Sequence, residues 1–220
     1  MESFDQAREI IYKELTSDDS ELRAEYLTLF EADVKTFADE MAHAVMAWRP
    51  LDANAKGDEK RAYVAALVCA AYTMHILSFK LFLSGHIVAA GNVFRQVLES
   101  IALALLCAGK GLGVLERFME DRYSANDAVR DVLHHGKKLH LKEDGLQALK
   151  TSQEFYHKYS HITRLTLGAI LSFSEEGTYV GASFDKGKIE AYRKEVTGRV
   201  GLAKVFTNFV EAVKANVAKW

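Results

Sequence analysis

The sequence is poor in residues that interrupt helices, because proline occurs only once among its 220 residues, at Pro50. Proline lacks a backbone N–H donor and clashes with the preceding turn inside a helix, so its scarcity favours long, uninterrupted helices. Hydrophobic residues make up 49% of the chain and charged residues 26%, the balance of a globular rather than a disordered protein. The chain can build one sizeable core, and we expect a single helical domain over residues 1–220.

Cysteine is almost as scarce, with only Cys69 and Cys107, each inside an apolar run. Their spacing is not that of a metal site, and we interpret both as small buried hydrophobes in a reducing compartment. The first residues lack the basic start and apolar core of a signal peptide. These absences predict a cytoplasmic protein. The formal net charge of -2 gives no overall attraction to nucleic acid or membrane, so either partner would require a local patch.

One uncharged stretch, residues 62–79, approaches the length of a membrane helix. It contains several polar side chains, His75 among them, and no second stretch of comparable character accompanies it. The helix that we expect next carries Arg95 and Glu99, which are costly in lipid. We therefore interpret residues 62–79 as a buried core helix and expect no membrane partner.

Apolar residues recur at steps of three and four through most of the chain, which is the spacing of one helix face. The pattern predicts helices over residues 4–15, 21–48, 58–83 and 87–108, shorter helices within 114–135 and 145–167, and a return to helix over 186–220. Arg49-Pro50 is expected to end the second of these. Ser84-Gly85 is expected to join residues 58–83 and 87–108 as a central antiparallel hairpin.

The spacing changes between residues 169 and 184. Two apolar segments, residues 170–173 and 178–180, flank Glu175-Glu176-Gly177, a pattern typical of a small β-hairpin or of an extended excursion. The predicted fold class is therefore all-α, an antiparallel multi-helix bundle with a β-hairpin-like excursion near 169–184.

Two patterns that suggest cofactors lead to no cofactor prediction. The sequence Gly109-Lys110-Gly111-Leu112-Gly113 shares glycine content with phosphate-binding loops, but no strand precedes it and no Lys-Ser/Thr follows, which indicates a linker between helices. Glu-x-x-His, half of a di-iron motif, begins at Glu40 and again at Glu154. His43 falls opposite the apolar face of its helix, and neither pair has an evident partner glutamate. We expect no resident metal and no cofactor.

Arg95 and Glu99 are four residues apart on an otherwise apolar helix, so they share a face and can pair. They form either a narrow solvated stripe or a buried pair that orders a polar centre or grips an anion. Further along, Tyr156 and Ser160 share a helix face. Ser160 and His161 diverge by about 100°, so they are not a nucleophile–base pair, although His161 could reach Glu99 or Arg95 from a neighbouring helix.

The third candidate cluster is Arg130-Asp131-Val132-Leu133-His134-His135, followed by the basic residues Lys137, Lys138, His140 and Lys142. A histidine can move a proton from a ribose hydroxyl, and an arginine can hold the phosphate as charge develops. In a continuous helix Arg130 and His135 lie about 140° apart, so a joint site requires the helix to end at His135-Gly136. The local basic charge suits a phosphate backbone.

This cluster resembles the Arg-polar-x-x-x-His signature of the HEPN superfamily, which comprises helical proteins of bacterial conflict and RNA-processing systems. The resemblance implies that Arg130, Asp131 and His135 line a metal-independent RNA-cleaving site, often across a homodimer interface. The helix with Arg95 and Glu99, together with the later Tyr-x-x-x-Ser-His stretch, is similar to bacterial helical families of unknown function, some grouped near HEPN proteins.

Two functional hypotheses follow. In the first, a HEPN-like homodimer in a bacterial defence or toxin-like setting binds or cleaves RNA, with no DNA specificity expected, and requires Arg130 and His135 exposed and convergent. In the second, the chain is a non-catalytic ligand-binding or structural bundle. Its polar centre would be formed by Arg95, Glu99, Tyr156, Ser160 and His161, with the Arg95–Glu99 pair buried beside His161.

Overall fold

The computed structural model describes residues 3–220, in which there are nine α-helices, two short 3-10 helices and no β-strand. Met1 and Glu2, the first two residues of the predicted domain and of its acidic start, lie outside the described residues. The first half of the chain forms four helices, α1 (Phe4–Thr16), α2 (Ser20–Ala53), α3 (Glu59–Leu83) and α4 (Ile87–Ala108). The second half forms α5 (Val114–Met119), α6 (Ala125–His135), α7 (Glu143–Tyr156), η1 (His157–Ser160), α8 (Arg164–Ile170), η2 (Lys186–Lys188) and α9 (Ile189–Val217). The all-α prediction is confirmed.

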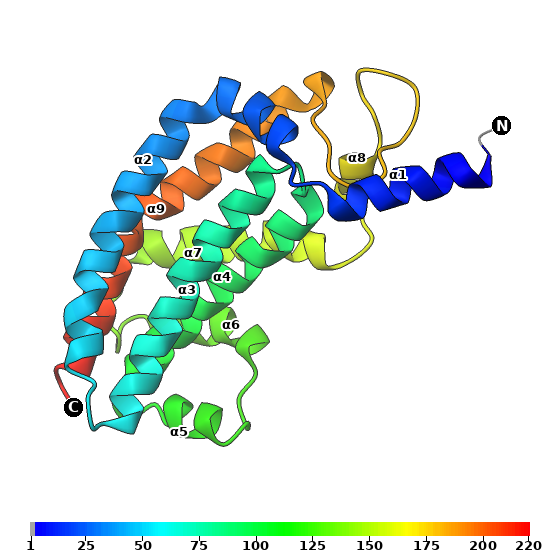
Figure 1. The fold of residues 1–220 in the computed structure, drawn as a ribbon. Coiled ribbons are helices and arrows are strands. Elements are labelled where there is room, and N and C mark those ends of the chain that lie inside the picture. The colour runs from blue at the N-terminus through cyan, green and yellow to red at the C-terminus, as the bar shows by residue number, and fades with distance from the viewer. Residues whose placement is uncertain (1–2) are drawn as a thin grey trace.

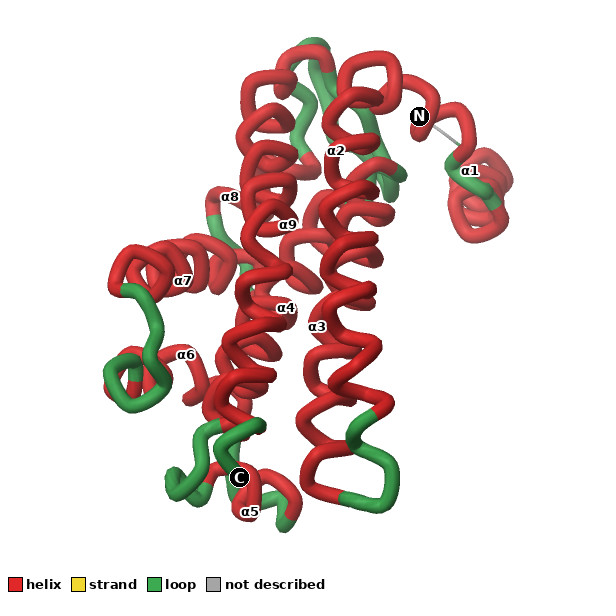
Figure 2. The backbone as a smooth tube through the Cα atoms, turned by 90° about the vertical axis from the view of Figure 1, so that its left-hand side faces the viewer, coloured by secondary structure: helices red, strands yellow, loops and turns green. Residues whose placement is uncertain are grey.

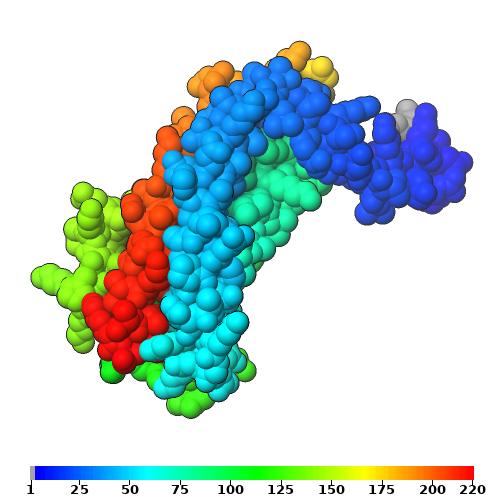
Figure 3. Space-filling view, turned by 60° about the vertical axis from the view of Figure 1, so that its left-hand side comes forward, coloured from blue at the N-terminus to red at the C-terminus, as the bar shows by residue number. Residues whose placement is uncertain are grey.

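The long helices α2, α3, α4 and α9 lie side by side along the length of the molecule (Figure 2). Helices α3 and α4 form the predicted hairpin through Ser84-Gly85, and α9 returns along α2. Helices α6 and α7 pack across α4. Helix α1 extends away from this body as an arm (Figures 1 and 3).

Helix α4 is the centre of the bundle, since every residue from Ile101 to Ala108 is buried. By length and composition both α3 and α4 could cross a membrane, which corrects the expectation that residues 62–79 have no counterpart of this character. Each of these helices packs against other helices of the bundle, and buried core helices share these features.

Helix α2 does not end at Arg49-Pro50 as predicted but continues to Ala53. Pro50 removes one hydrogen bond near the carboxyl end of the helix, where its ring is exposed. Burial of Leu51 and Ala55 holds the last turn against the core and offsets that loss.

The β-hairpin-like excursion predicted near residues 169–184 is not supported, because the segment forms no strand. An isolated antiparallel bridge joins Leu171 and Thr178, and no strand forms around it. The buried carboxylate of Asp185 accepts the backbone N–H of Phe173 at 2.7 Å and that of Gly187 at 2.8 Å. Lys188 lies between the rings of Phe173 and Tyr179, with its ammonium 5.3 Å and 5.2 Å from their centres. A side-chain carboxylate and a lysine therefore organise this segment in place of a strand ladder.

An aromatic cluster in the core encloses His75 of α3, which has no exposed surface. Its ring stacks on Phe206 and makes an edge contact with Phe37. The Nε2–H donates to the backbone carbonyl of Arg199 at 3.1 Å, so Nδ1 is the unprotonated nitrogen. Burial, followed by the charge of Arg199, lowers the pKa of His75 from its ordinary value near 6.5 to about 3.

The lowered pKa of His75 predicts that the protein loses stability in mild acid. Below about pH 6.5 the unfolded chain binds a proton at this histidine and the folded chain does not, so unfolding becomes more favourable as pH falls towards 3. Between pH 7 and pH 5 this one group should remove about 2 kcal/mol from the free energy of unfolding. In urea unfolding, His75→Phe should lose that much less stability than the wild type over this range. The exposed-site control His43→Gln should follow the wild type, and equal pH dependence in all three proteins would contradict the prediction.

Candidate functional site

The most deeply buried charge in the described chain is the guanidinium of Arg199, which has no exposed surface. On the preceding turn of α9, the carboxylate of Glu195 pairs with its Nη1. The Nε–H donates to the hydroxyl of Ser78 on α3 at 3.2 Å, and that hydroxyl donates to the carbonyl of Ala90 on α4 at 2.9 Å. The guanidinium also lies 5.1 Å from the ring centre of Phe94, within the range of a cation–π contact.

Two tyrosines complete this buried ionic centre from the other side of Glu195. Tyr156, at the end of α7, donates to Oε2 at 2.9 Å, and Tyr159, in η1, donates to Oε1 at 2.8 Å. Burial raises the pKa of both phenols, so both remain protonated donors. Gly91 makes room for the Tyr159 ring on α4, because a Cβ there would lie 2.4 Å from the ring. The centre thus ties α7 and η1 to α9 through the core.

The sequence pattern pointed to Tyr156 but not to Glu195 or Arg199. Their position in the predicted helix over residues 186–220 was the available signal. Glu195 and Arg199 are four residues apart, on the same helix face as three apolar residues that are buried, Tyr192, Val196 and Ala203. A charge pair within an apolar stripe indicates a buried pair. Helical spacing also failed for Tyr156 and Ser160, because α7 ends at Tyr156 and the chain tightens into η1.

Arg95 and Glu99 do form a pair, with Nε 3.5 Å from Oε1. The side chain of Glu99 is 7% exposed and that of Arg95 is 18% exposed. Gln153 of α7 donates to Glu99 at 3.1 Å, and Arg95 donates through Nη1 to Ser160 at 3.2 Å. The pair therefore joins α4 to α7 and η1, and it is mostly buried rather than a solvated stripe.

His161 and Tyr156 are not part of the Arg95–Glu99 cluster. The His161 side chain is exposed, and its ring contacts the ring of His157 at a centre-to-centre distance of 4.9 Å. Tyr156 belongs to the buried ionic centre instead. Of the five residues predicted to form one polar centre, the structure brings together Arg95, Glu99 and Ser160. Neither of the two cavities described below is lined by these three.

The Arg-Asp-x-x-x-His stretch lies on the surface helix α6. The guanidinium of Arg130 forms ion pairs with Asp127 at 3.2 Å and Asp131 at 3.0 Å, and Tyr123 donates to the other oxygen of Asp131 at 2.9 Å. Helix α6 ends at His135, the position at which a helix end was required to bring Arg130 and His135 together. The backbone does not turn away there, however, because Gly136 keeps helical dihedral angles. Because the helix is continuous from Arg130 to His135, the two side chains leave it about 140° apart. Within one chain they do not converge, and Arg130 is already neutralised by carboxylates.

A basic pocket of about 320 Å³ lies where three helices end. The glycine-rich loop after α4 contributes Lys110, the turn after α6 contributes Lys138 and His140, and the end of α9 contributes Lys219. No carboxylate is among the described residues that line it. Asn216 braces the floor by donating to the carbonyl of Leu139 at 3.1 Å.

Part of this positive charge offsets the partial negative charge at the carboxyl ends of nearby helices. Helices α4, α6 and α9 all direct their carboxyl ends, which carry partial negative charge, towards this region. Three helix ends supply about 1.5 units of partial negative charge, whereas three lysines supply a full unit each. Lys110 and Lys219 reach a carbonyl and an amide oxygen at the long distances of 3.5 Å and 3.4 Å, and Lys138 has no ion pair among residues 3–220. A net positive cavity with exposed ammonium groups remains.

Among residues 3–220, no three His, Cys, Asp or Glu side chains gather closely enough to hold a metal ion. His43, part of the first Glu-x-x-His pair, is exposed on α2.

The buried ionic centre predicts a large loss of stability when it is broken on one side only. Glu195→Ala leaves Arg199 buried without its carboxylate and should lower the free energy of unfolding by about 3–5 kcal/mol. The double variant Glu195→Leu, Arg199→Met should recover much of that loss. Glu190→Ala, which breaks the exposed Glu190–Arg193 pair on the same helix, should cost less than about 1 kcal/mol. Urea unfolding measures all three, and a Glu195→Ala variant as stable as the Glu190→Ala control would contradict the assignment.

Comparison of the chain with protein-family models, with curated proteins and with solved structures finds no match to any of them.

Proposed function

We propose that the protein binds RNA through its backbone phosphates at the basic pocket formed by Lys110, Lys138, His140 and Lys219. The observation that carries the proposal is a concave surface with several ammonium groups and no lining carboxylate, in a chain whose net charge is -2. Phosphate backbones bind to such surfaces by displacing condensed counterions, without contacts to particular bases. Lys137 and Lys142, both exposed on the same turn, extend the basic surface beyond the pocket.

RNA is the polyanion that the sequence favours. The turn carrying Lys138 and His140 directly follows the Arg130-to-His135 stretch, whose resemblance to the HEPN signature implies RNA as the substrate class. In this proposal Arg130 and His135 do not cleave RNA. The two carboxylates on Arg130 compete with a phosphate for its guanidinium, and the histidine points to another side of α6.

The hypothesis of a non-catalytic polar centre is favoured by a different observation, the mostly buried Arg95–Glu99 pair with Gln153 and Ser160. Its groups bind one another across α4, α7 and η1. We propose a structural role for this cluster. It holds α7 and η1 against α4, and α7 directly follows the turn that carries Lys138 and His140.

Binding at the pocket predicts a specific change in salt dependence. Lys138→Ala should weaken the binding of a fluorescein-labelled single-stranded RNA and make the slope of log K against log salt less negative by about 0.7. Adding Lys110→Ala should approximately double that change. Fluorescence anisotropy over a range of salt concentrations measures both quantities.

The matched control is Lys204→Ala, which removes the same charge from an exposed position on α9 about 20 Å from the carboxyl end of that helix. Its salt slope should equal that of the wild type. If Lys138→Ala and Lys204→Ala change the slope equally, the binding is not at this pocket. If the wild type does not bind RNA, the proposed function is wrong.

The geometry of α6 predicts binding without cleavage. Purified protein incubated with end-labelled RNA in EDTA should leave the RNA intact, as should Arg130→Ala and His135→Ala, because Arg130 and His135 diverge on one helix. Gel electrophoresis of the labelled RNA is the measurement. Cleavage that persists in EDTA and disappears in both variants would overturn this proposal and establish the nuclease hypothesis.

A further inference from the structure

Helix α1 is a 13-residue helix with no buried residue. Its apolar side chains Phe4, Ile11 and Leu15 form one stripe, and Phe4 and Leu15 are about four-fifths exposed, at 80% and 78%. A capping box at Ser3 fixes its start. Isolated helices of this length are marginal in water, so an amphipathic helix projecting into solvent (Figures 1 and 3) requires a surface to pack against.

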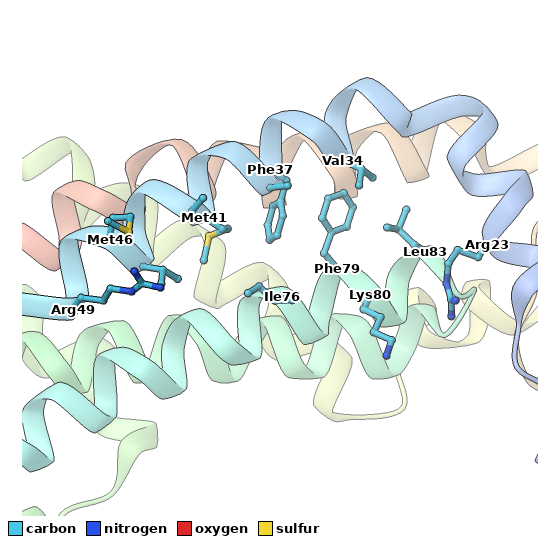
Figure 4. A pocket seen from close by; sticks show the side chains of 13 residues that line it. Arg23, Val34, Phe37, Met41, Met46, Arg49, Ile76, Phe79, Lys80 and Leu83 are labelled. Atoms are coloured by element: carbon cyan, nitrogen blue, oxygen red, sulfur yellow. The ribbon is translucent and has the colours of Figure 1, made fainter. Parts of the chain in front are cut away.

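An apolar groove of about 530 Å³ lies between α2 and α3. Phe37 and Met41 of α2 and Phe79 of α3 form its floor, and Met46 and Ile76 are exposed to solvent within it (Figure 4). Apart from Arg23, near the start of α2, the lining on that helix runs from Val34 to Arg49, a length of about 22 Å. Helix α1 is about 20 Å long, so the groove can hold the whole helix.

The groove is lined by cations, whereas α1 has one more acidic than basic side chain. Arg23, Arg49 and Lys80 line the groove, with Arg49 near one end and the other two towards the opposite end (Figure 4), and no carboxylate is among its described lining residues. Helix α1 carries three acidic side chains, Asp5, Glu9 and Glu14, and two basic ones, Arg8 and Lys13. Arg8, which pairs with Asp5 at 3.2 Å, lies beside the apolar stripe, and Lys13 lies on the opposite face of the helix. The groove therefore suits an amphipathic helix whose charge is acidic on balance.

Helix α1 is held away from the groove of its own chain. Glu14, near its carboxyl end, accepts the backbone N–H of Ala182 at 2.9 Å. The Asp19 carboxylate, just before α2, accepts a hydrogen bond from Nε2 of His86 at 3.0 Å. To fold back into its own groove, the arm would have to break the Glu14 contact. A second copy of the chain can supply its α1 without breaking either contact.

We infer that two copies of this chain form a symmetric dimer in which α1 of each copy packs in the α2–α3 groove of the other. Each arm–groove contact has an equivalent by symmetry, so the two together need bury about 1,600 Å² for a stable interface, or about 800 Å² each. The apolar stripe with Phe4, Ile11 and Leu15 meets Phe37, Met41 and Ile76. The acidic side chains of α1 outnumber its basic ones, so the helix carries a charge opposite to that of the cations in the groove. This surface is separate from the basic pocket, so the dimer does not depend on the proposed RNA binding.

Sedimentation velocity over a range of protein concentrations tests the dimer. The wild type should be dimeric, and Ile11→Asp on the arm and Met46→Asp in the groove should each raise the dissociation constant about tenfold or more. Lys13→Asp, on the opposite face of α1, should leave it unchanged. All three substitutions are at exposed positions, and circular dichroism verifies that the variants remain folded. A monomeric wild type, or a dimer indifferent to both Ile11→Asp and Met46→Asp, would overturn the inference.

Cross-linking then establishes which chain fills the groove. In a Cys69→Ala background, differently tagged chains carrying either Ile11→Cys or Met46→Cys are mixed and treated with a short bis-maleimide. Cross-links between the two tags are expected, and replacing Ile11→Cys by Lys13→Cys should abolish them. If a chain carrying both Ile11→Cys and Met46→Cys cross-links only within itself, α1 folds back and the exchange between copies is wrong.

Discussion

The rest of the structure depends on the burial of one permanent charge. Arg199 has no contact with solvent, and a guanidinium cannot be neutralised by losing a proton inside a protein. Its charge is therefore held by Ser78 of α3 and by Glu195, one turn earlier on α9, with aromatic rings of α3 and α4 on its faces. Glu195 is fixed in turn by Tyr156 of α7 and Tyr159 of η1. The two tyrosines come from α7 and η1, which pack across α4. The ionic centre therefore fixes where α7 and η1 meet the long helices.

The Arg95–Glu99 pair reinforces the same junction nearer the surface. It joins α4 to Gln153 and Ser160, while the buried centre joins the neighbouring Tyr156 and Tyr159 to α9. Helix α6 also packs on α4 and on α7, and the turn after it presents Lys138 and His140 to the basic pocket. The two polar clusters thus support the candidate RNA-binding surface without touching it, which is the usual relation between a rigid scaffold and the loops it positions.

The basic side chains on the surface differ in whether a carboxylate lies next to them. Arg130 has two acidic neighbours on its own helix, whereas the pocket lysines and the cations of the α2–α3 groove have none lining the same cavity. A chain with a net charge of -2 thereby carries two local positive surfaces of different character. The pocket is lined by lysine, histidine and a glycine-rich loop, and it suits small, highly charged phosphate groups. The groove is lined mainly by aliphatic, aromatic and methionine side chains, and it suits the apolar face of an amphipathic helix.

The sequence by itself determined most of the helices, because an apolar period of three to four residues and the scarcity of proline leave few other structures available. It placed α4 with the observed bounds and the turn at Ser84-Gly85, and it placed Arg95 and Glu99 together, because residues four apart on one helix are neighbours in any fold. It failed where a distant residue decides local structure. Asp185 organises the segment where a hairpin was predicted, and the burial of Leu51 stabilises the helical turn of α2 that follows Pro50.

Contacts between elements were decided only by the tertiary structure. No local pattern brings Tyr156 and Tyr159 to Glu195, gathers three lysines from three helix ends, or separates His161 from Arg95. These residues are distant in sequence, and their meeting depends on how the helices pack around the core. A helical period fixes which side chains share a face, but it does not determine which face of another helix they will meet.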